Sequence, residues 1–216
     1  MCKDRIGGSG RSVRRLLLLG CLTACATTPP PPPPEGPSPE DYAPFAVGSS
    51  WTYALSFQGQ TGERTVKITG IEDGYFVDDQ KGHFRHSPEG LRDPQRFLIR
   101  KPLVAGNTWK AIVSASAVEN YSILSVGDPC SVRAGQFADC LVIESRLRRD
   151  AHVSLFIRFT WAKGVGLARI ETMAEIDGRR VPQTDQSLLH YGLGAATDTP
   201  PAPAKEEGDD GPNTWK

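Results

Sequence analysis

Apolar and polar residues alternate with a period of two along the middle of this chain. Trp51, Tyr53, Leu55 and Phe57 occupy every second position, and a run of turn-forming residues follows at 58–62. Successive side chains of a β-strand point to opposite faces of a sheet, so this spacing predicts a strand with one buried face. Similar segments are predicted at 66–68, 75–77, 96–100, 108–116, 118–126, 138–148, 152–162, 166–175 and 181–191.

These segments predict one all-β domain over residues 44–192. No stretch shows a helical period over three or more turns, and short turns separate the predicted strands. Such spacing favours a single antiparallel meander that forms a curved sheet or half-barrel, since curling protects the edge strands. The segment is close to the usual domain size and is long enough for one core.

An internal repeat predicts a sheet built from two related halves. Residues 44–51 align without gaps to residues 102–109, and proline, glycine and tryptophan are identical in the two copies. In each copy the glycine permits a turn before the tryptophan opens a new strand. Trp51 and Trp109 are therefore expected at equivalent core positions.

The first 25 residues have the pattern of an export signal. Five basic residues and one acidic residue precede a short apolar run that begins at Leu16. This run is too short to cross a bilayer, which needs about 20 residues. Leu22-Thr23-Ala24-Cys25 resembles the lipobox of bacterial lipoproteins, which implies a signal peptide over residues 1–24. The same resemblance implies a mature chain that begins at a diacylated Cys25.

The residue after this cysteine indicates in which membrane the lipid anchor is held. In lipoproteins an aspartate there favours retention in the inner membrane, and this chain has Ala26. The resemblance therefore implies a lipid anchor in the outer membrane of a Gram-negative host. Three alternatives stay open, namely a twin-arginine signal at Arg14-Arg15, acylation at Cys21, and an ordinary buried helix.

A linker and a tail flank the predicted domain. Residues 25–43 comprise the predicted acylated cysteine and a linker with six consecutive prolines at 29–34, which force an extended polyproline II conformation. This linker is either a selected spacer that holds the domain away from lipid or an unselective connection. Residues 193–216 are rich in proline, alanine, glycine and acidic residues, so we predict a disordered tail.

The charge balance argues against nucleic acid as a partner. The chain carries 25 basic and 25 acidic residues, and removal of residues 1–24 takes away five basic residues and one acidic residue. The mature chain is therefore acidic, and no basic surface that suits a nucleic-acid backbone is expected.

Cys130 and Cys140 are the cysteines that remain after acylation at Cys25. A hairpin that turns at Gly135 would place them opposite each other, within reach of a disulfide. Export to an oxidising compartment favours such a bond. Two free buried thiols are the alternative, and a redox role is disfavoured because the chain lacks a Cys-x-x-Cys motif.

We find no pattern that predicts catalysis, a metal site or a cofactor. His83 and His86 lie near Asp78 and Asp79, but residues three apart on a strand point to opposite faces, so exposed polar residues explain them better than a metal site does. Nucleophile-elbow, zinc-protease and P-loop motifs are absent from the sequence. The cluster of Arg146, Arg148 and Arg149 predicts a solvated strand face, with contact to an anion or lipid headgroup as the alternative. Because no catalytic motif is found, we expect that the protein is not an enzyme.

A second resemblance covers most of residues 44–175. The Gly-x-x-Trp copies, the Gly-x-Phe-x-x-Cys hairpin at 135–140 and the Trp-x-x-Gly-Val-Gly run at 161–166 resemble a group of secreted bacterial β-domains. This resemblance implies a fold related to the half-barrel of periplasmic lipoprotein carriers, and it transfers no catalytic residue. Arg133 departs from the pattern, in which proline is expected.

The sequence therefore favours a non-enzymatic binding module for an apolar ligand. Its concave face is expected to carry aromatic side chains, although alternating aromatics also make ordinary core. A structural or assembly partner in an envelope complex is the alternative, and an enzyme is the third hypothesis. The predicted ligand-contacting residues are Trp51, Tyr53, Phe57, Trp109, Phe156 and Trp161.

Overall fold

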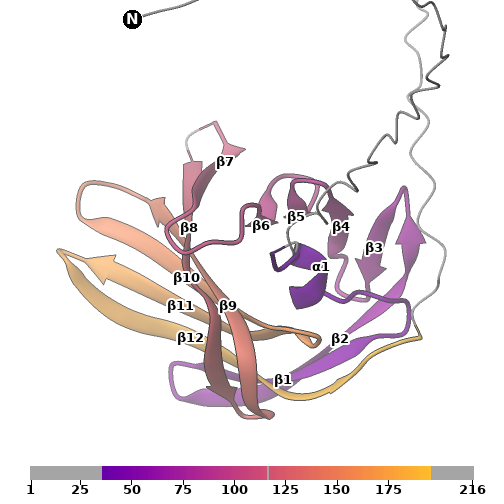
Figure 1. The fold of residues 1–216 in the computed structure, drawn as a ribbon. Coiled ribbons are helices and arrows are strands. Elements are labelled where there is room, and N and C mark those ends of the chain that lie inside the picture. The colour runs from indigo at the N-terminus through magenta and orange to yellow at the C-terminus, as the bar shows by residue number, and fades with distance from the viewer. Residues whose placement is uncertain (1–35, 116, 196–216) are drawn as a thin grey trace, which may run out of the picture. The chain divides into compact units, whose positions relative to one another are not determined.

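The computed structural model describes residues 36–115 and 117–195, which form one curved sheet around a short helix (Figure 1). The predicted signal peptide, the predicted acylation site Cys25, the proline run and the tail beyond residue 195 lie outside these described residues. The elements are α1 (Pro39–Tyr42), β1 (Ser50–Phe57), β2 (Gln60–Glu72), β3 (Tyr75–Asp78), β4 (His83–Ser87), β5 (Gly90–Arg92), β6 (Phe97–Arg100), β7 (Thr108–Ser114), β8 (Ala117–Val132), β9 (Gly135–Arg148), β10 (Val153–Ala162), β11 (Gly166–Ile176) and β12 (Arg179–Gly192).

The sheet confirms the predicted all-β antiparallel class. Its strand order is β6-β5-β4-β3-β2-β1-β12-β11-β10-β9-β8-β7, so two six-stranded meanders join where β1 pairs with β12. Within each meander every strand pairs antiparallel with the next strand along the chain, which is the arrangement that short turns allow. In the described parts of the chain, no helix is long and apolar enough to cross a membrane.

The sequence repeat is also a structural repeat. Gly48 N–H donates to Ile68 O over 2.9 Å, and Gly106 N–H donates to Ile123 O over 2.8 Å. Both glycines have φ near +90°, at +91° and +86°, a conformation that favours glycine over any other residue. The tryptophan three positions after each glycine is 4% exposed. The two copies thus start β1 and β7 by the same turn and bury their tryptophans.

Side chains join the two edges of the sheet where backbone pairing stops. Trp109 in β7 donates its Nε1–H to the Phe97 carbonyl oxygen in β6 over 3.0 Å. Next to this contact, Arg96 forms an ion pair with Glu119 of β8. Because β6 and β7 are the two ends of the strand order, these contacts bring the curled sheet close to closure.

Helix α1 lies on the concave side of this sheet (Figure 1). Tyr42 is fully buried, and its hydroxyl donates to Asp139 Oδ1 over 2.6 Å. Gly164 N–H donates to the Asp41 carbonyl oxygen over 2.6 Å, which fixes the helix to the β10–β11 turn. The predicted boundary at residue 44 is therefore too late. Residues 36–43, which we assigned to the linker, include buried parts of the domain core.

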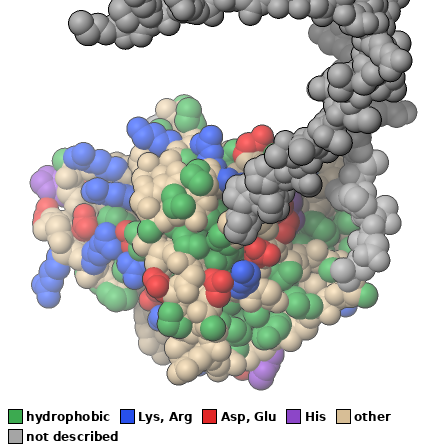
Figure 2. Space-filling model, viewed as in Figure 1, with side chains coloured by type: hydrophobic (Ala, Val, Ile, Leu, Met, Phe, Trp, Pro, Cys, Tyr) green, Lys and Arg blue, Asp and Glu red, His purple; other side chains and the backbone are tan. Residues whose placement is uncertain are grey.

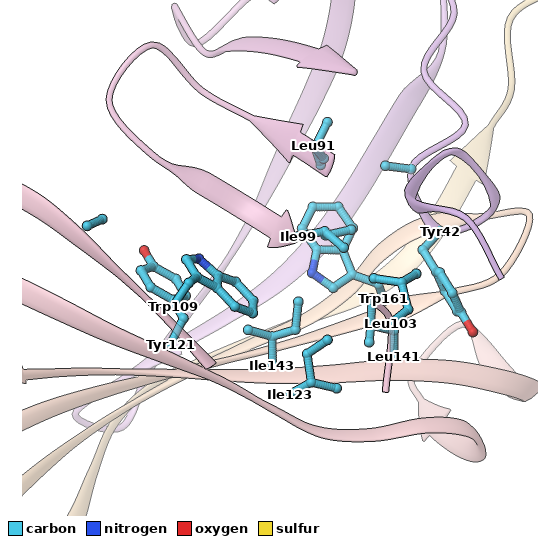
Figure 3. Packing of buried hydrophobic residues seen from close by; sticks show 12 residues of the cluster. Tyr42, Leu91, Ile99, Leu103, Trp109, Tyr121, Ile123, Leu141, Ile143 and Trp161 are labelled. Atoms are coloured by element: carbon cyan, nitrogen blue, oxygen red, sulfur yellow. The ribbon is translucent and has the colours of Figure 1, made fainter. Parts of the chain in front are cut away.

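The main core lies between α1 and the concave face of the sheet. Figure 3 shows Tyr42 and Trp161 on the same side of the sheet as Trp109 and Tyr121. Trp109 and Tyr121 stack with ring centroids 5.2 Å apart. The other buried members of this cluster are Ala43, Leu91, Ile99, Leu103, Ala111, Ile123, Leu141 and Ile143.

The β8–β9 hairpin carries the predicted disulfide. Cys130 and Cys140 are bonded, with their Cα atoms 6.0 Å apart. The turn itself differs from the prediction, because Val132 pairs with Gly135 and the chain reverses at residues 133–134. Because of this tight turn Cys130 pairs with Phe137, and the register shift between Asp128 and Cys130 places Cys140 opposite Asp128. The disulfide therefore spans a bulged part of the ladder diagonally.

The tip of this hairpin packs against β12. Ala134 N–H donates to the Leu188 carbonyl oxygen over 2.7 Å, and Arg133 N–H donates to Ser187 Oγ over 3.2 Å. Cys140 is buried in a second apolar cluster that also contains Leu188. The bulges bend the hairpin toward β12, and the disulfide lies at the base of the bent part.

Candidate functional site: an interior cavity

The six aromatic residues predicted to contact a ligand do not form one surface. Trp51, Tyr53, Trp109 and Trp161 are buried, whereas Phe57 is 48% exposed at the end of β1. Trp109 lies against Tyr121 in the main core and bridges the sheet edges. Phe57, Trp109 and Phe156 therefore do not line the cavity described below.

Phe156 lies on the opposite face of the sheet from Trp161, which corrects its predicted position. The two residues are five positions apart in β10, and an odd separation in a strand gives opposite faces. The Phe156 ring is buried beneath two guanidinium groups, with Arg180 Cζ 3.9 Å and Arg146 Cζ 5.4 Å from its centroid. Phe156 thus supports a charged outer face.

The outer face near this residue carries paired charges. Arg146 forms an ion pair with Glu175 at 3.6 Å, and Arg180 pairs with Glu144 at 3.2 Å. In Figure 2, basic side chains gather at this end of the sheet and acidic side chains lie among them. The predicted solvated strand face fits this arrangement, because exposed ion pairs leave little net field to attract an anion.

Trp51, Tyr53 and Trp161 line one cavity on the concave side of the sheet, with a volume of about 180 Å³. Phe45 and Phe84 complete its aromatic walls. Aliphatic side chains of β2 and β11 supply the remaining apolar surface, namely Val66, Ile68, Leu167 and Ile170.

The polar atoms of the wall residues Trp51 and Tyr53 donate hydrogen bonds to backbone carbonyl oxygens. Trp51 Nε1–H donates to Val165 O and the Tyr53 hydroxyl donates to Leu167 O, each over 2.8 Å. Burial raises the pKa of Tyr53 far above its usual value, so the phenol stays neutral. Both side chains therefore contribute apolar ring surface to the cavity.

Three polar residues complete the lining: Arg64, Asp78 and Gln186. Asp78 is 8% exposed, and its Oδ1 accepts hydrogen bonds from Gln80 N–H over 2.8 Å and Gly82 N–H over 2.6 Å. Within the described ranges, its Oδ2 has no hydrogen bond and the carboxylate has no ion pair. From the sequence, Asp78 is only part of a disfavoured metal site, and the sequence pattern does not indicate that this residue faces a cavity.

The histidines near Asp78 do not converge on a metal site. His86 Nε2 lies 2.9 Å from the Ala43 carbonyl oxygen, which can only accept, so Nε2 carries the proton. His83 Nδ1 lies 3.1 Å from the Lys81 carbonyl oxygen. No group of three or more metal-ligating side chains occurs among residues 36–115 and 117–195. His86 is also less exposed than predicted, because its ring packs on Phe45 with centroids 5.9 Å apart.

Comparisons with known proteins give little beyond this geometry. No protein-family model matches the chain, and no curated protein matches its sequence. A crystal structure from Parabacteroides distasonis ATCC 8503, provisionally described as a lipoprotein, is similar over 70% of this chain and 98% of its own, with 13% identity and a TM-score of 0.39. These comparisons assign no family to this chain.

Proposed function

We propose that this protein is a lipid-anchored bacterial envelope protein whose β-domain binds a small ligand without catalysing a reaction. The anchor is Cys25, diacylated before residues 1–24 are removed and held in the outer membrane, and its support is the lipobox-like Leu22-Thr23-Ala24-Cys25. The ligand site is the interior cavity lined by Trp51, Tyr53 and Trp161.

The cavity carries this proposal because it has the usual properties of a small-molecule site. Ligand sites are concave and mostly apolar, with a few polar groups that fix orientation. A volume of about 180 Å³ is close to that of engineered cavities, of about 150 Å³, that take up benzene. The site therefore suits a compact ligand better than a long acyl chain.

The anchor is tested by metabolic labelling with palmitate and by membrane fractionation of the full chain. We expect label in the outer-membrane fraction, and no label in the Cys25→Ser variant. Label that persists in Cys25→Ser and disappears in Cys21→Ser would place the acyl group at the rival cysteine. Absence of label from the wild-type chain would contradict the anchor itself.

The ligand site is tested by native mass spectrometry of the mature chain carrying Cys25→Ser, secreted into an oxidising periplasm. We expect a retained small molecule, and we expect its loss in Ile170→Trp, since Ile170 lines the cavity and the larger ring fills it. Leu155→Trp is the matched control, because Leu155 is an exposed residue of β10. Retention of the same mass in Ile170→Trp would place the ligand elsewhere.

A partner-binding role is the second candidate, favoured by the edge strand β7. Ile112 is 76% exposed there and pairs with Val118, another exposed apolar residue. Unpaired strand edges with apolar side chains are suited to pairing with a second chain. An empty cavity together with stoichiometric co-purification of an envelope protein, lost in Ile112→Lys, would favour this role.

A further inference from the structure

We propose that the cavity ligand is a small zwitterion, with its alkylammonium group against Asp78 and its anionic group at Arg64. This inference rests on the proposed function and specifies the chemical class of the ligand. It depends on three features of the cavity: a buried carboxylate without a cation, aromatic walls around it, and a free guanidinium at some distance.

Asp78 is a largely buried carboxylate that forms no ion pair with another described residue. Buried charges are normally paired or hydrogen-bonded at each polar atom, because removal from water is costly. The two backbone donors of the Gln80–Gly82 turn both reach Oδ1, and Oδ2 accepts no hydrogen bond within the described residues, while Asp78 lines the cavity. No lysine, arginine or histidine among the described residues lies within ion-pair distance of this carboxylate. A bound ammonium group would complete the site.

The aromatic walls favour an alkylated ammonium over a metal ion. Phe45 lies 5.2 Å from Phe84 and 5.9 Å from Trp51, measured between ring centroids. Tyr53 and Trp161 line the same space. Aromatic rings attract organic cations electrostatically while offering apolar surface to their methyl groups, which is how quaternary ammonium ligands are bound in aromatic cages. A metal ion would need several oxygen or nitrogen ligands, and Asp78 is the single carboxylate in the lining.

Arg64 is placed to bind the other end of such a ligand. It precedes Ile68 by four residues in β2, and Ile68 pairs with Asp78 of β3. At about 3.3 Å per residue, the backbone positions of the two charges are roughly 13 Å apart along the strand direction. Arg64 is exposed and forms no ion pair within the described residues. The cation thus lies deep beside Asp78, and the anion lies toward solvent.

The test compares choline, phosphocholine and 3,3-dimethyl-1-butanol, the uncharged analogue of choline, by calorimetric titration of the mature chain carrying Cys25→Ser. We expect phosphocholine to bind most tightly and the uncharged alcohol at least about tenfold more weakly than choline, which corresponds to one lost charge interaction. Trp51 and Trp161 line the cavity, so quenching of tryptophan fluorescence gives an independent signal.

Two variants locate the charges. Asp78→Asn keeps an oxygen that can accept from Gln80 and Gly82, so the turn is preserved, and we expect it to weaken choline and phosphocholine but not the alcohol. Arg64→Gln changes an exposed side chain, and we expect it to reduce phosphocholine to the affinity of choline. Asp79→Asn, which changes the neighbouring exposed carboxylate, is the matched control and should leave all three affinities unchanged.

The outcomes separate this inference from the proposed function. If the alcohol binds as tightly as choline, or if Asp78→Asn changes nothing, the cavity is a purely apolar site and the zwitterion is excluded. If only fatty acids bind and Arg64→Gln abolishes that binding, the ligand is an anion. If no probe binds and native mass spectrometry shows an empty cavity, the proposed function fails as well. If phosphocholine does bind, flotation with phosphatidylcholine vesicles distinguishes a lipid headgroup from free phosphocholine as the source.

Discussion

Trp161 and Trp109 are buried indoles of the same size with different hydrogen bonding. Trp109 Nε1–H bridges the sheet edges through the Phe97 carbonyl oxygen. Trp161 Nε1 is buried without a partner among the described residues. A buried donor without an acceptor costs free energy, whereas a satisfied one contributes modestly to stability.

Replacement of each tryptophan by phenylalanine tests this difference. Trp109→Phe and Trp161→Phe remove similar volumes, so the packing losses are matched. We expect Trp109→Phe to lower the free energy of unfolding by about 1–2 kcal/mol more than Trp161→Phe does, because it also loses a hydrogen bond. Urea unfolding with tyrosine and tryptophan emission measures both values. Equal losses would show that the Trp109 contact contributes nothing to closing the sheet.

Helix α1 is the element whose attachment depends most on a titratable group. His86 Nε2–H donates to the carbonyl oxygen of Ala43, the residue that ends the helix, and Glu40 Oε1 lies 3.7 Å from His86 Nδ1. Burial lowers the pKa of His86, and the negative charge of Glu40 and the bond to Ala43 offset part of this effect. His86 is therefore neutral in the folded chain at pH 7.

Acidification is expected to weaken this attachment. Because the pKa of His86 is lower in the folded chain than its usual value near 6.5, the unfolded chain takes up the proton first, and stability is lost as the pH falls through about 6.5. His86→Gln retains an N–H donor for Ala43 and should flatten this dependence between about pH 7.5 and 5.5. Thermal unfolding across this range is the measurement. An unchanged slope in His86→Gln would assign the pH dependence to other groups.

Across the described residues, two six-stranded meanders are held together at β1 and β12, and the β8–β9 hairpin clamps them. The hairpin tip reaches β12 through Ala134 and Arg133, and the Cys130–Cys140 disulfide lies beside these contacts. A crosslink within a bent hairpin restricts the unfolded chain and holds the tip in its native register.

Removal of the disulfide is therefore expected to lower global stability. Replacement of both cysteines by serine should reduce the free energy of unfolding by about 2–3 kcal/mol in the chain-entropy model. Chemical denaturation of the oxidised chain and of the double variant measures this loss, and intact mass verifies that the parent is oxidised. A single replacement is a poorer comparison, since it leaves a free thiol. A double variant as stable as the parent would assign the register to the bulges alone.

Local pattern predicted the strands well, but it did not predict which aromatic residues share a surface. Trp51 and Tyr53 belong together because they are two residues apart in one strand. Trp161 joins them because the sheet curls, and the parity that excludes Phe156 from their face was already readable in β10. The position of Asp78 in a cavity wall could not be foreseen, because the other lining residues include members of β1, β2 and β10.

The sequence by itself determined the all-β class, most strand positions and the turns at Gly48 and Gly106, because these depend on side-chain alternation and local backbone conformation. It also determined that Cys130 and Cys140 lie close enough in the chain to bond. Only the tertiary structure decided the burial of α1, the closure of the sheet by Trp109 and the cavity beside Asp78. Each of these depends on contacts between residues far apart in the chain, which no local period encodes.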